Sequence, residues 1–104
     1  MIVGIGVDIV EIARFEKLRK KFGDRFAGRI LTADELIEYE RRGQSCSYLA
    51  LRFAAKEAVV KALRSEWEHV PYREIEIVQQ ASGAPDVRLH ASVLDLALAQ
   101  QLSS

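Results

Sequence analysis

The chain has 104 residues, of which 49% are hydrophobic and 29% are charged. This length allows one domain, and the composition supplies enough apolar material for a core and too much for a disordered chain. Fifteen basic residues balance fifteen acidic ones, which argues against a general nucleic-acid-binding protein because such proteins carry a basic excess. The single cysteine, Cys46, excludes an intrachain disulfide and a zinc site built on thiolates. The sequence shows no secretory signal pattern and no apolar run long enough to span a membrane, so we expect a cytoplasmic protein.

The apolar patterns predict a single α+β domain with few strands. In chain order, the predicted elements are a buried strand at 1–10, helices at 11–22, 24–31, 32–42 and 45–64, strands at 74–78 and 87–89, and a helix at 91–102. Gly23 and Gly43 are natural helix stops, and Thr32 and Glu35 form a capping-box pattern. Turn residues at 82–85 join the last two strands into a hairpin. A three-stranded sheet has exposed edges, which suggests pairing with another subunit.

Asp8 stands in the otherwise apolar first strand. A buried carboxylate costs several kcal/mol unless it is paired or bound to a metal. Gly4 and Gly6 share its face of the strand and leave room for the close approach of a ligand. Two interpretations stay open at this point. Asp8 either binds a ligand or marks the end of the strand and caps the next helix.

A second candidate group lies on the long predicted helix at 45–64. Phe53, Glu57 and Lys61 are spaced four residues apart and therefore form one row on its surface. Glu57 and Lys61 fit an exposed ion pair worth a few tenths of a kcal/mol. They also fit a metal-binding carboxylate beside a phosphate-binding lysine, because magnesium sites commonly combine one or two carboxylates with substrate phosphates.

The third feature is a basic segment between Arg14 and Arg29. It carries seven basic residues against two acidic ones, a local charge of +5. Such a segment is either a solvated face or a docking surface for an acidic partner. Phe22 and Phe26 lie among the basic residues, and an apolar contact ringed by arginine and lysine suits a protein partner better than nucleic acid.

Several segments together resemble the holo-acyl-carrier-protein synthases of the 4'-phosphopantetheinyl transferase superfamily. The resemblance covers nearly the whole chain up to about Leu98, in the same order. It is carried by Gly4-Ile5-Gly6-Val7-Asp8-Ile9-Val10-Glu11-Ile12, Arg25-Phe26-Ala27-Gly28-Arg29-Ile30-Leu31-Thr32, Arg52-Phe53-Ala54-Ala55-Lys56-Glu57-Ala58 with Lys61-Ala62-Leu63, and Arg73-Glu74-Ile75-Glu76-Ile77 followed by Gly83-Ala84-Pro85. The first and third segments occurring together are specific to that family.

The resemblance implies the family's fold, a small antiparallel sheet packed with a long helix and completed by trimerisation. It also implies a magnesium-dependent activity. The phosphopantetheine arm of coenzyme A moves to a serine of apo acyl carrier protein, and adenosine 3',5'-bisphosphate is released. The expected substrate and partners are therefore coenzyme A, an acyl carrier protein and two further copies of this chain, with no nucleic acid and no membrane.

The resemblance also assigns roles to individual residues. Asp8 and Glu57 match the metal-binding acids, and Glu57 would take the proton of the serine. Lys61 would stabilise the departing bisphosphate. The residues expected to contact coenzyme A are Lys61, Arg52, Lys56, Gly83 and Pro85. The residues expected to dock the carrier protein are Arg14, Leu18, Arg25, Phe26 and Arg29.

Two segments depart from the family pattern. Leu63 is followed by Arg64-Ser65-Glu66-Trp67, where the family usually has a Gly-Thr-Gly loop that shapes the coenzyme A pocket. The family's strands after the last helix have no counterpart before Ser104, so we expect one domain over residues 1–104 without them. An alternative function follows from these differences: a relative with impaired catalysis that acts only as a carrier-binding or oligomeric module.

Overall fold

The computed structural model describes residues 9–63 and 70–103. The elements in chain order are α1 (Ile9–Phe22), α2 (Asp24–Ile30), α3 (Ala33–Arg41), α4 (Cys46–Ala62), the short 3-10 helix η1 (Tyr72–Glu74), β1 (Ile75–Gln79), β2 (Pro85–Leu89) and α5 (Ala91–Ser103). Within these residues, no helix is both long enough and apolar enough to cross a lipid bilayer.

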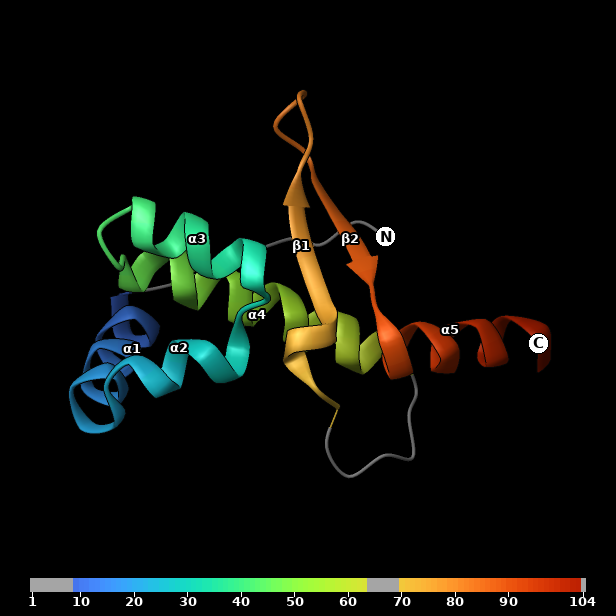
Figure 1. Cartoon of the computed structure of the whole chain (residues 1–104), viewed down its shortest axis with the longest axis horizontal. Coiled ribbons are helices and arrows are strands. Elements are labelled where there is room, and N and C mark those ends of the chain that lie inside the picture. The colour runs from blue at the N-terminus through green and yellow to red at the C-terminus, as the bar shows by residue number, and fades with distance from the viewer. Residues whose placement is uncertain (1–8, 64–69, 104) are drawn as a thin grey trace.

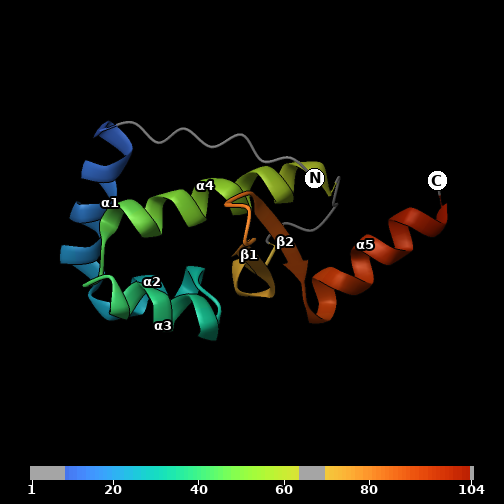
Figure 2. The same cartoon turned by 90° about the horizontal axis from the view of Figure 1, so that it is seen from above.

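The long helix α4 is the centre of the arrangement (Figure 1). Figure 2 shows α1 lying across one end of α4, with α2 and α3 along one side and the β1–β2 hairpin near its other end. Direct contacts join α4 to α1 and to β1, and η1 contacts both α2 and α5. Helix α5 extends away from the hairpin at the far end of the molecule.

Two clusters of buried side chains hold these elements together. The first cluster is rich in aromatic residues. The centroid of the Phe15 ring lies 5.5 Å from that of the Phe26 ring and 5.3 Å from that of the Phe53 ring. The second is aliphatic and joins the later half of α4 to the hairpin and α5 through residues such as Val59 and Val93. Each fully buried side chain of this size contributes roughly 1.5–3 kcal/mol to the stability of the fold. The aromatic cluster therefore holds the helices α1, α2 and α3 against one part of α4, and the aliphatic cluster holds the hairpin against the other part.

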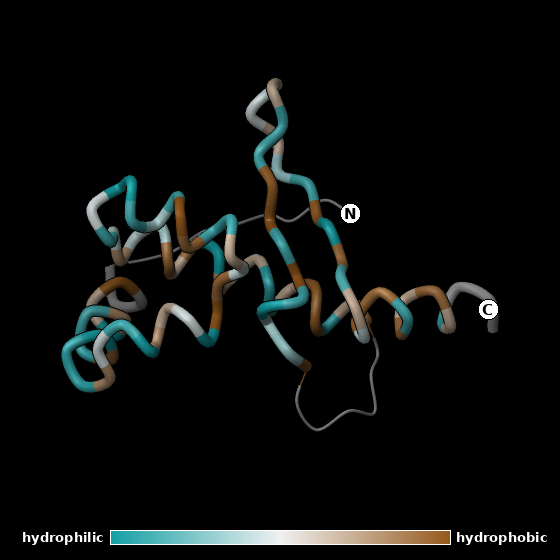
Figure 3. The backbone as a smooth tube through the Cα atoms, in the orientation of Figure 1, coloured by the Kyte–Doolittle hydropathy of each residue, from teal (hydrophilic) through white to brown (hydrophobic). Residues whose placement is uncertain are grey.

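The strands β1 and β2 pair antiparallel, with Ile75 opposite Leu89 and Gln79 opposite Pro85. Figure 3 shows apolar and polar residues alternating along β2, as expected for a strand with one packed face. Gly83 in the connecting turn has a φ of 89°, a conformation that residues with a Cβ rarely adopt. Gly83 N–H donates to the carbonyl of Gln80 at 2.8 Å, which closes the turn.

The predicted fold class is confirmed: the structure has a small antiparallel sheet packed with a long helix. The capping box is also present, since Thr32 Oγ1 accepts from Glu35 N–H and Glu35 Oε1 accepts from Thr32 N–H. Ser45 caps α4 by accepting a hydrogen bond from Tyr48 N–H at 3.3 Å.

Several element boundaries differ from the sequence predictions, by one or two residues each. Helix α1 begins at Ile9, so the predicted strand at 1–10 is wrong at its last two positions, where β-branched residues continue into a helix with apolar side chains at helical spacing. The first eight residues of that predicted strand lie outside the described residues. Strand β1 runs one residue later than predicted, and β2 begins two residues earlier, at Pro85.

Candidate functional site

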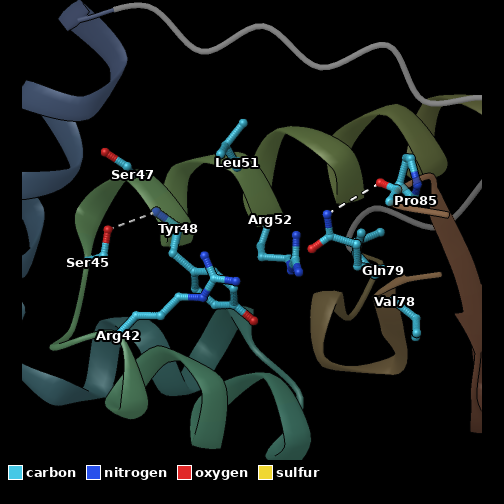
Figure 4. Close-up of a pocket in the computed structure, with 11 residues that line it drawn as sticks. Arg42, Ser45, Ser47, Tyr48, Leu51, Arg52, Val78, Gln79 and Pro85 are labelled. Atoms are coloured by element: carbon cyan, nitrogen blue, oxygen red, sulfur yellow. Dashed lines mark hydrogen bonds between the residues drawn. The ribbon is translucent and has the colours of Figure 1, made fainter. Parts of the chain in front are cut away.

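A cavity of about 470 Å³ opens between the start of α4, the end of α3 and the hairpin. Its lining comes from segments far apart in the sequence: Arg42, Ser45, Ser47, Tyr48, Leu51, Arg52, Ile77, Val78, Gln79, Gly83 and Pro85. The structure therefore brings together three of the residues expected to contact coenzyme A, namely Arg52, Gly83 and Pro85. Figure 4 shows Arg52 projecting from α4 into the space between α3 and the hairpin.

Two arginines give this cavity a positive wall. The guanidinium carbon of Arg52 lies 4.6 Å from the centroid of the Tyr48 ring, and that of Arg42 lies 5.0 Å from the same centroid. Arg42 Nε also donates to Glu38 Oε1 at 2.7 Å. Arg52 Nε is buried and has no hydrogen-bond partner within the described part of the chain. Guanidinium groups beside an aromatic ring suit a planar, anionic ligand because they both pair with phosphate and stack on rings.

Beneath the cavity floor, Glu35 and Lys56 form a buried ion pair. Lys56 is 0% exposed and Glu35 3% exposed, and Lys56 Nζ lies 2.5 Å from Glu35 Oε1. Lys56 also donates to the carbonyls of Ile30 at 2.6 Å and Tyr72 at 3.1 Å, so all three ammonium protons have protein acceptors. Burial lowers the pKa of Lys56, and Glu35 opposes that effect.

This placement corrects the expectation that Lys56 contacts coenzyme A. A fully buried ammonium with three protein acceptors has no proton left for a ligand. Lys56 instead ties α4 to α2, α3 and η1. No signal of this is present in the sequence, because the acceptors of Lys56 come from Ile30, Glu35 and Tyr72, which lie 16 to 26 residues away along the chain.

Glu57 and Lys61 lie on α4 beyond the cavity. Glu57 is half-buried and Lys61 is exposed, and no ion pair joins them in residues 9–63 and 70–103. The exposed ion pair that the spacing allowed is therefore not formed there. Burial first and the Glu57 charge second raise the pKa of Tyr72, so the Glu57 carboxylate lies close enough to Tyr72 to affect it.

Of the two residues predicted to hold the metal, only Glu57 is among the described residues. Asp8 lies outside the described residues, and within those residues no three histidine, cysteine, aspartate or glutamate side chains gather as a metal cluster. Glu57 supplies a half-buried carboxylate without an ion-pair partner in the described part of the chain. A single such carboxylate fits magnesium, which is usually held by one or two carboxylates together with waters and substrate phosphates.

A second hollow, a groove of about 580 Å³, lies on the other side of α4. It is lined by Lys21, Phe22, Arg25, Phe26, Arg29, Ile30, Phe53 and Tyr72. Three residues of the predicted docking surface, Arg25, Phe26 and Arg29, therefore meet in one groove. Its floor is aromatic, since the Phe53 ring centroid is 5.2 Å from that of Tyr72, and three cationic side chains surround that floor.

Arg14 and Leu18 lie on α1 and do not line this groove. They precede Lys21 and Phe22 by spacings that put all four on one face of α1, so they extend the same surface along the helix. Arg14 is exposed and its guanidinium carbon lies 6.0 Å from the Phe15 ring centroid, while Leu18 is half-buried.

Sequence reasoning missed several residues that line the two hollows. Arg42, Ser45, Tyr48 and Tyr72 belong to no motif that points to a site. Phe53 is predicted only as a member of the row that also holds Glu57 and Lys61. Their signal was weak because an aromatic residue at helical spacing predicts burial whether or not its edge also faces a groove.

The fold and these two hollows can be compared with known proteins. The model of the 4'-phosphopantetheinyl transferase superfamily matches residues 4–103, and the chain belongs to that superfamily. It is 41% identical over 104 residues to the holo-acyl-carrier-protein synthase of Halorhodospira halophila, a match covering 99% of this chain and 82% of the relative. The predicted family resemblance is therefore confirmed.

Solved structures agree with this assignment. The structure is similar to holo-acyl-carrier-protein synthase from Neisseria meningitidis, with a TM-score of 0.75 and 46% identity over 97% of this chain and 81% of that chain. It is also similar to the acyl carrier protein synthase of Plasmodium yoelii solved with ADP bound. That match has a TM-score of 0.75 and 29% identity, and it covers 95% of this chain and 77% of that chain.

Proposed function

We propose that this protein transfers the 4'-phosphopantetheine arm of coenzyme A to a serine of apo acyl carrier protein. The observation that carries the proposal is the meeting of Arg52, Gly83 and Pro85 at one cavity. The family resemblance assigns all three to coenzyme A, although they come from two segments some thirty residues apart in the chain. The names of the relatives, holo-acyl-carrier-protein synthases, support the same activity.

The cavity suits the nucleotide end of coenzyme A. Its positive wall, Arg42 and Arg52 beside Tyr48, offers charge to phosphate groups and flat surfaces to a base. The Plasmodium yoelii relative was solved with ADP, which has the adenosine and phosphates that also form part of coenzyme A. Gly83 and Pro85 would close the hairpin side of the same pocket.

The reacting end of coenzyme A would lie further along α4. At 1.5 Å per residue, Glu57 and Lys61 follow Arg52 by about 7.5 and 13.5 Å along the helix axis. The hydroxyl of the carrier serine would attack the β-phosphate, forming a new O–P bond as the bond to the bisphosphate breaks. Glu57 would accept the hydroxyl proton, and the Lys61 ammonium would stabilise the charge on the departing adenosine 3',5'-bisphosphate.

We propose that Asp8 and Glu57 hold Mg²⁺. When bound, the metal would neutralise charge on the pyrophosphate. Glu57 suits this role because it carries no ion-pair partner among the described residues. Asp8 is proposed from the sequence alone.

The acyl carrier protein would dock in the groove, with Arg25, Phe26 and Arg29 as contacts and Arg14 and Leu18 extending the surface. A cationic rim around an aromatic floor suits an acidic, amphipathic helix. Phe53 lines this groove and lies one turn before Glu57 on the same row of α4. A carrier held there would bring its serine to the side of α4 that bears the proposed base.

A homotrimer is part of the proposal. The described sheet has two strands, and Leu94 and Leu98 on α5 are 40% and 48% exposed, so apolar surface is available for another subunit. Analytical ultracentrifugation should then give a mass near three chains at micromolar concentration. A monomer at every concentration that supports catalysis would contradict the trimer.

Binding of coenzyme A is tested by titration calorimetry with two matched variants. Arg52→Ala should weaken binding at least about tenfold, since it removes a charged hydrogen-bonding group. Arg88→Ala removes an exposed arginine of β2 that does not line the cavity, and it should bind as the unmodified chain does. Equal affinity in the two variants would place coenzyme A elsewhere.

Carrier docking is tested in the same way. The double charge reversal Arg25→Glu and Arg29→Glu should weaken binding of apo acyl carrier protein and remove most of its salt dependence. The double reversal Arg41→Glu and Arg88→Glu changes the net charge by the same amount at exposed residues outside the groove, and it is the matched control. An equal loss in both variants would show only a general effect of net charge.

One alternative remains tied to a specific observation. Arg64-Ser65-Glu66-Trp67 stand where the family has a Gly-Thr-Gly loop. A carrier-binding or oligomeric module without catalysis would bind the carrier normally but fail to transfer the arm. The same titrations, combined with an assay of transfer, distinguish the two functions.

A further inference from the structure

The buried pair of Glu35 and Lys56 touches residues that line both the cavity and the groove. We propose that Glu35 is a positioning residue for both: with Lys56, it fixes the wall that binds coenzyme A and the wall that docks the carrier relative to one another. This inference rests on the proposed function of the two hollows.

On the cavity side, the contacts come from Glu35 Oε2. This oxygen accepts a hydrogen bond from Ile77 N–H at 3.0 Å and lies 3.9 Å from Arg52 Nε. Ile77 and Arg52 both line the cavity. Because Arg52 Nε has no hydrogen bond of its own among the described residues, the Glu35 charge and the Tyr48 ring hold its guanidinium in place.

On the groove side, the contacts run through Lys56. Glu35 Oε1 holds the ammonium at 2.5 Å, and the ammonium binds the carbonyls of Ile30 and Tyr72. Ile30 and Tyr72 both line the groove. They belong to α2 and η1, two elements that contact each other. Lys56 therefore sets the spacing between the arginine-bearing helix of the groove and the aromatic residue opposite it.

The arrangement requires a carboxylate at this position. Both oxygens of Glu35 accept hydrogen bonds, Oε1 from Lys56 and Thr32 N–H, and Oε2 from Ile77 N–H. A glutamine has one oxygen and one NH₂ group, so it would present a donor to at least one of these donors. Replacement by glutamine should therefore shift Arg52 and Ile77 with little change in side-chain volume.

The test is a double-mutant cycle on coenzyme A affinity, measured by titration calorimetry. Glu35→Gln should raise the Kd about tenfold, the loss expected when a charged hydrogen-bonding group is misplaced. In an Arg52→Ala background the same substitution should change Kd by about threefold or less, because the residue through which Glu35 acts is gone. Glu35→Gln should also weaken binding of a purified bacterial apo acyl carrier protein.

The control separates positioning from general destabilisation. Val93→Ala opens the aliphatic cluster at a 0% exposed residue that lines neither hollow. The temperature of the measurement is adjusted until Val93→Ala is destabilised as much as Glu35→Gln. Val93→Ala should then leave the affinities for coenzyme A and for the apo carrier unchanged. The inference would be overturned if Val93→Ala weakened binding as much as Glu35→Gln does. It would also be overturned if the fold-changes in Kd caused by Glu35→Gln and by Arg52→Ala simply multiplied in the double variant.

A measurement on the unmodified chain covers the case in which Glu35→Gln does not fold. In NMR spectra, coenzyme A and the apo carrier should each shift the Ile77 amide and Lys56 ammonium signals. Signals at both positions that neither ligand moves would overturn the inference while leaving the proposed function intact. Absence of any coenzyme A binding by the unmodified chain would instead overturn both.

Discussion

The substitution Lys56→Met gives the sharpest test of how this fold is held together. It keeps most of the side-chain volume and removes the ammonium that binds Glu35, Ile30 and Tyr72. The Glu35 carboxylate would stay buried at 3% exposure with two backbone N–H donors and Arg52 at 3.9 Å. Removing one partner of a buried pair costs about 3–5 kcal/mol.

The donors that Glu35 keeps place the expected loss at the lower end, about 3 kcal/mol. For a chain of this size, each kcal/mol shifts Tm by about 4–8 °C, so the melting temperature should fall by roughly 12–24 °C. The assay is urea or thermal unfolding followed by circular dichroism. Adding Glu35→Gln to Lys56→Met removes both charges and should recover at least about 1 kcal/mol.

Lys61→Met is the matched control for this experiment. Lys61 is an exposed lysine on the same helix, and its replacement should change the free energy of unfolding by no more than about 0.5 kcal/mol. A cost of less than about 1 kcal/mol for Lys56→Met would contradict a stabilising role of the buried ammonium. A double variant less stable than Lys56→Met alone would contradict the cost of an unpaired Glu35 carboxylate.

Three further outcomes follow from local geometry. Gly83→Ala should lower the free energy of unfolding in urea by about 1–2 kcal/mol because of the φ of 89° alone, since no atom lies within 4 Å of an added Cβ. An unchanged midpoint of urea unfolding would contradict this conformation of the turn. Ser45→Ala should cost about 1 kcal/mol in the same assay by removing the α4 cap, whereas a cost equal to that of Ser47→Ala would not fit. Hydrogen bonds from Arg41 and Arg42 lower the pKa of Glu38 to about 2. Its contribution to stability should therefore be complete above pH 4.5 and disappear as the pH falls toward 2, and this part of the acid dependence should be absent in Glu38→Gln; an NMR titration of Glu38 near its usual value would refute the pairing.

The sequence predicted the helices and the hairpin because those signals are local. The capping box at Thr32, the glycine stops and the alternation at Ile75 and Ile77 each act within a few residues. The failure at Ile9 has a physical cause too. β-branched residues favour a strand when considered alone, but packing of the following apolar face onto α4 decides the helix in the folded chain.

The residues of the candidate site were also predictable only where the signal lies in the sequence itself. Family resemblance pointed to Arg52, Gly83 and Pro85, and the structure brings them to one cavity. It could not reveal that Lys56 is buried, because a lysine beside an apolar stripe is usually exposed. Only the long-range contacts to Ile30 and Tyr72 make the buried position possible.

The most direct test of the proposed activity is mass spectrometry of an apo acyl carrier protein after incubation with this protein, coenzyme A and Mg²⁺. We expect the carrier to gain the mass of one phosphopantetheine group, and we expect EDTA to prevent the gain. Glu57→Ala should abolish the gain, whereas Arg88→Ala should not. A carrier that stays unmodified, while a control synthase modifies the same preparation, would contradict the transferase and leave the binding module as the function.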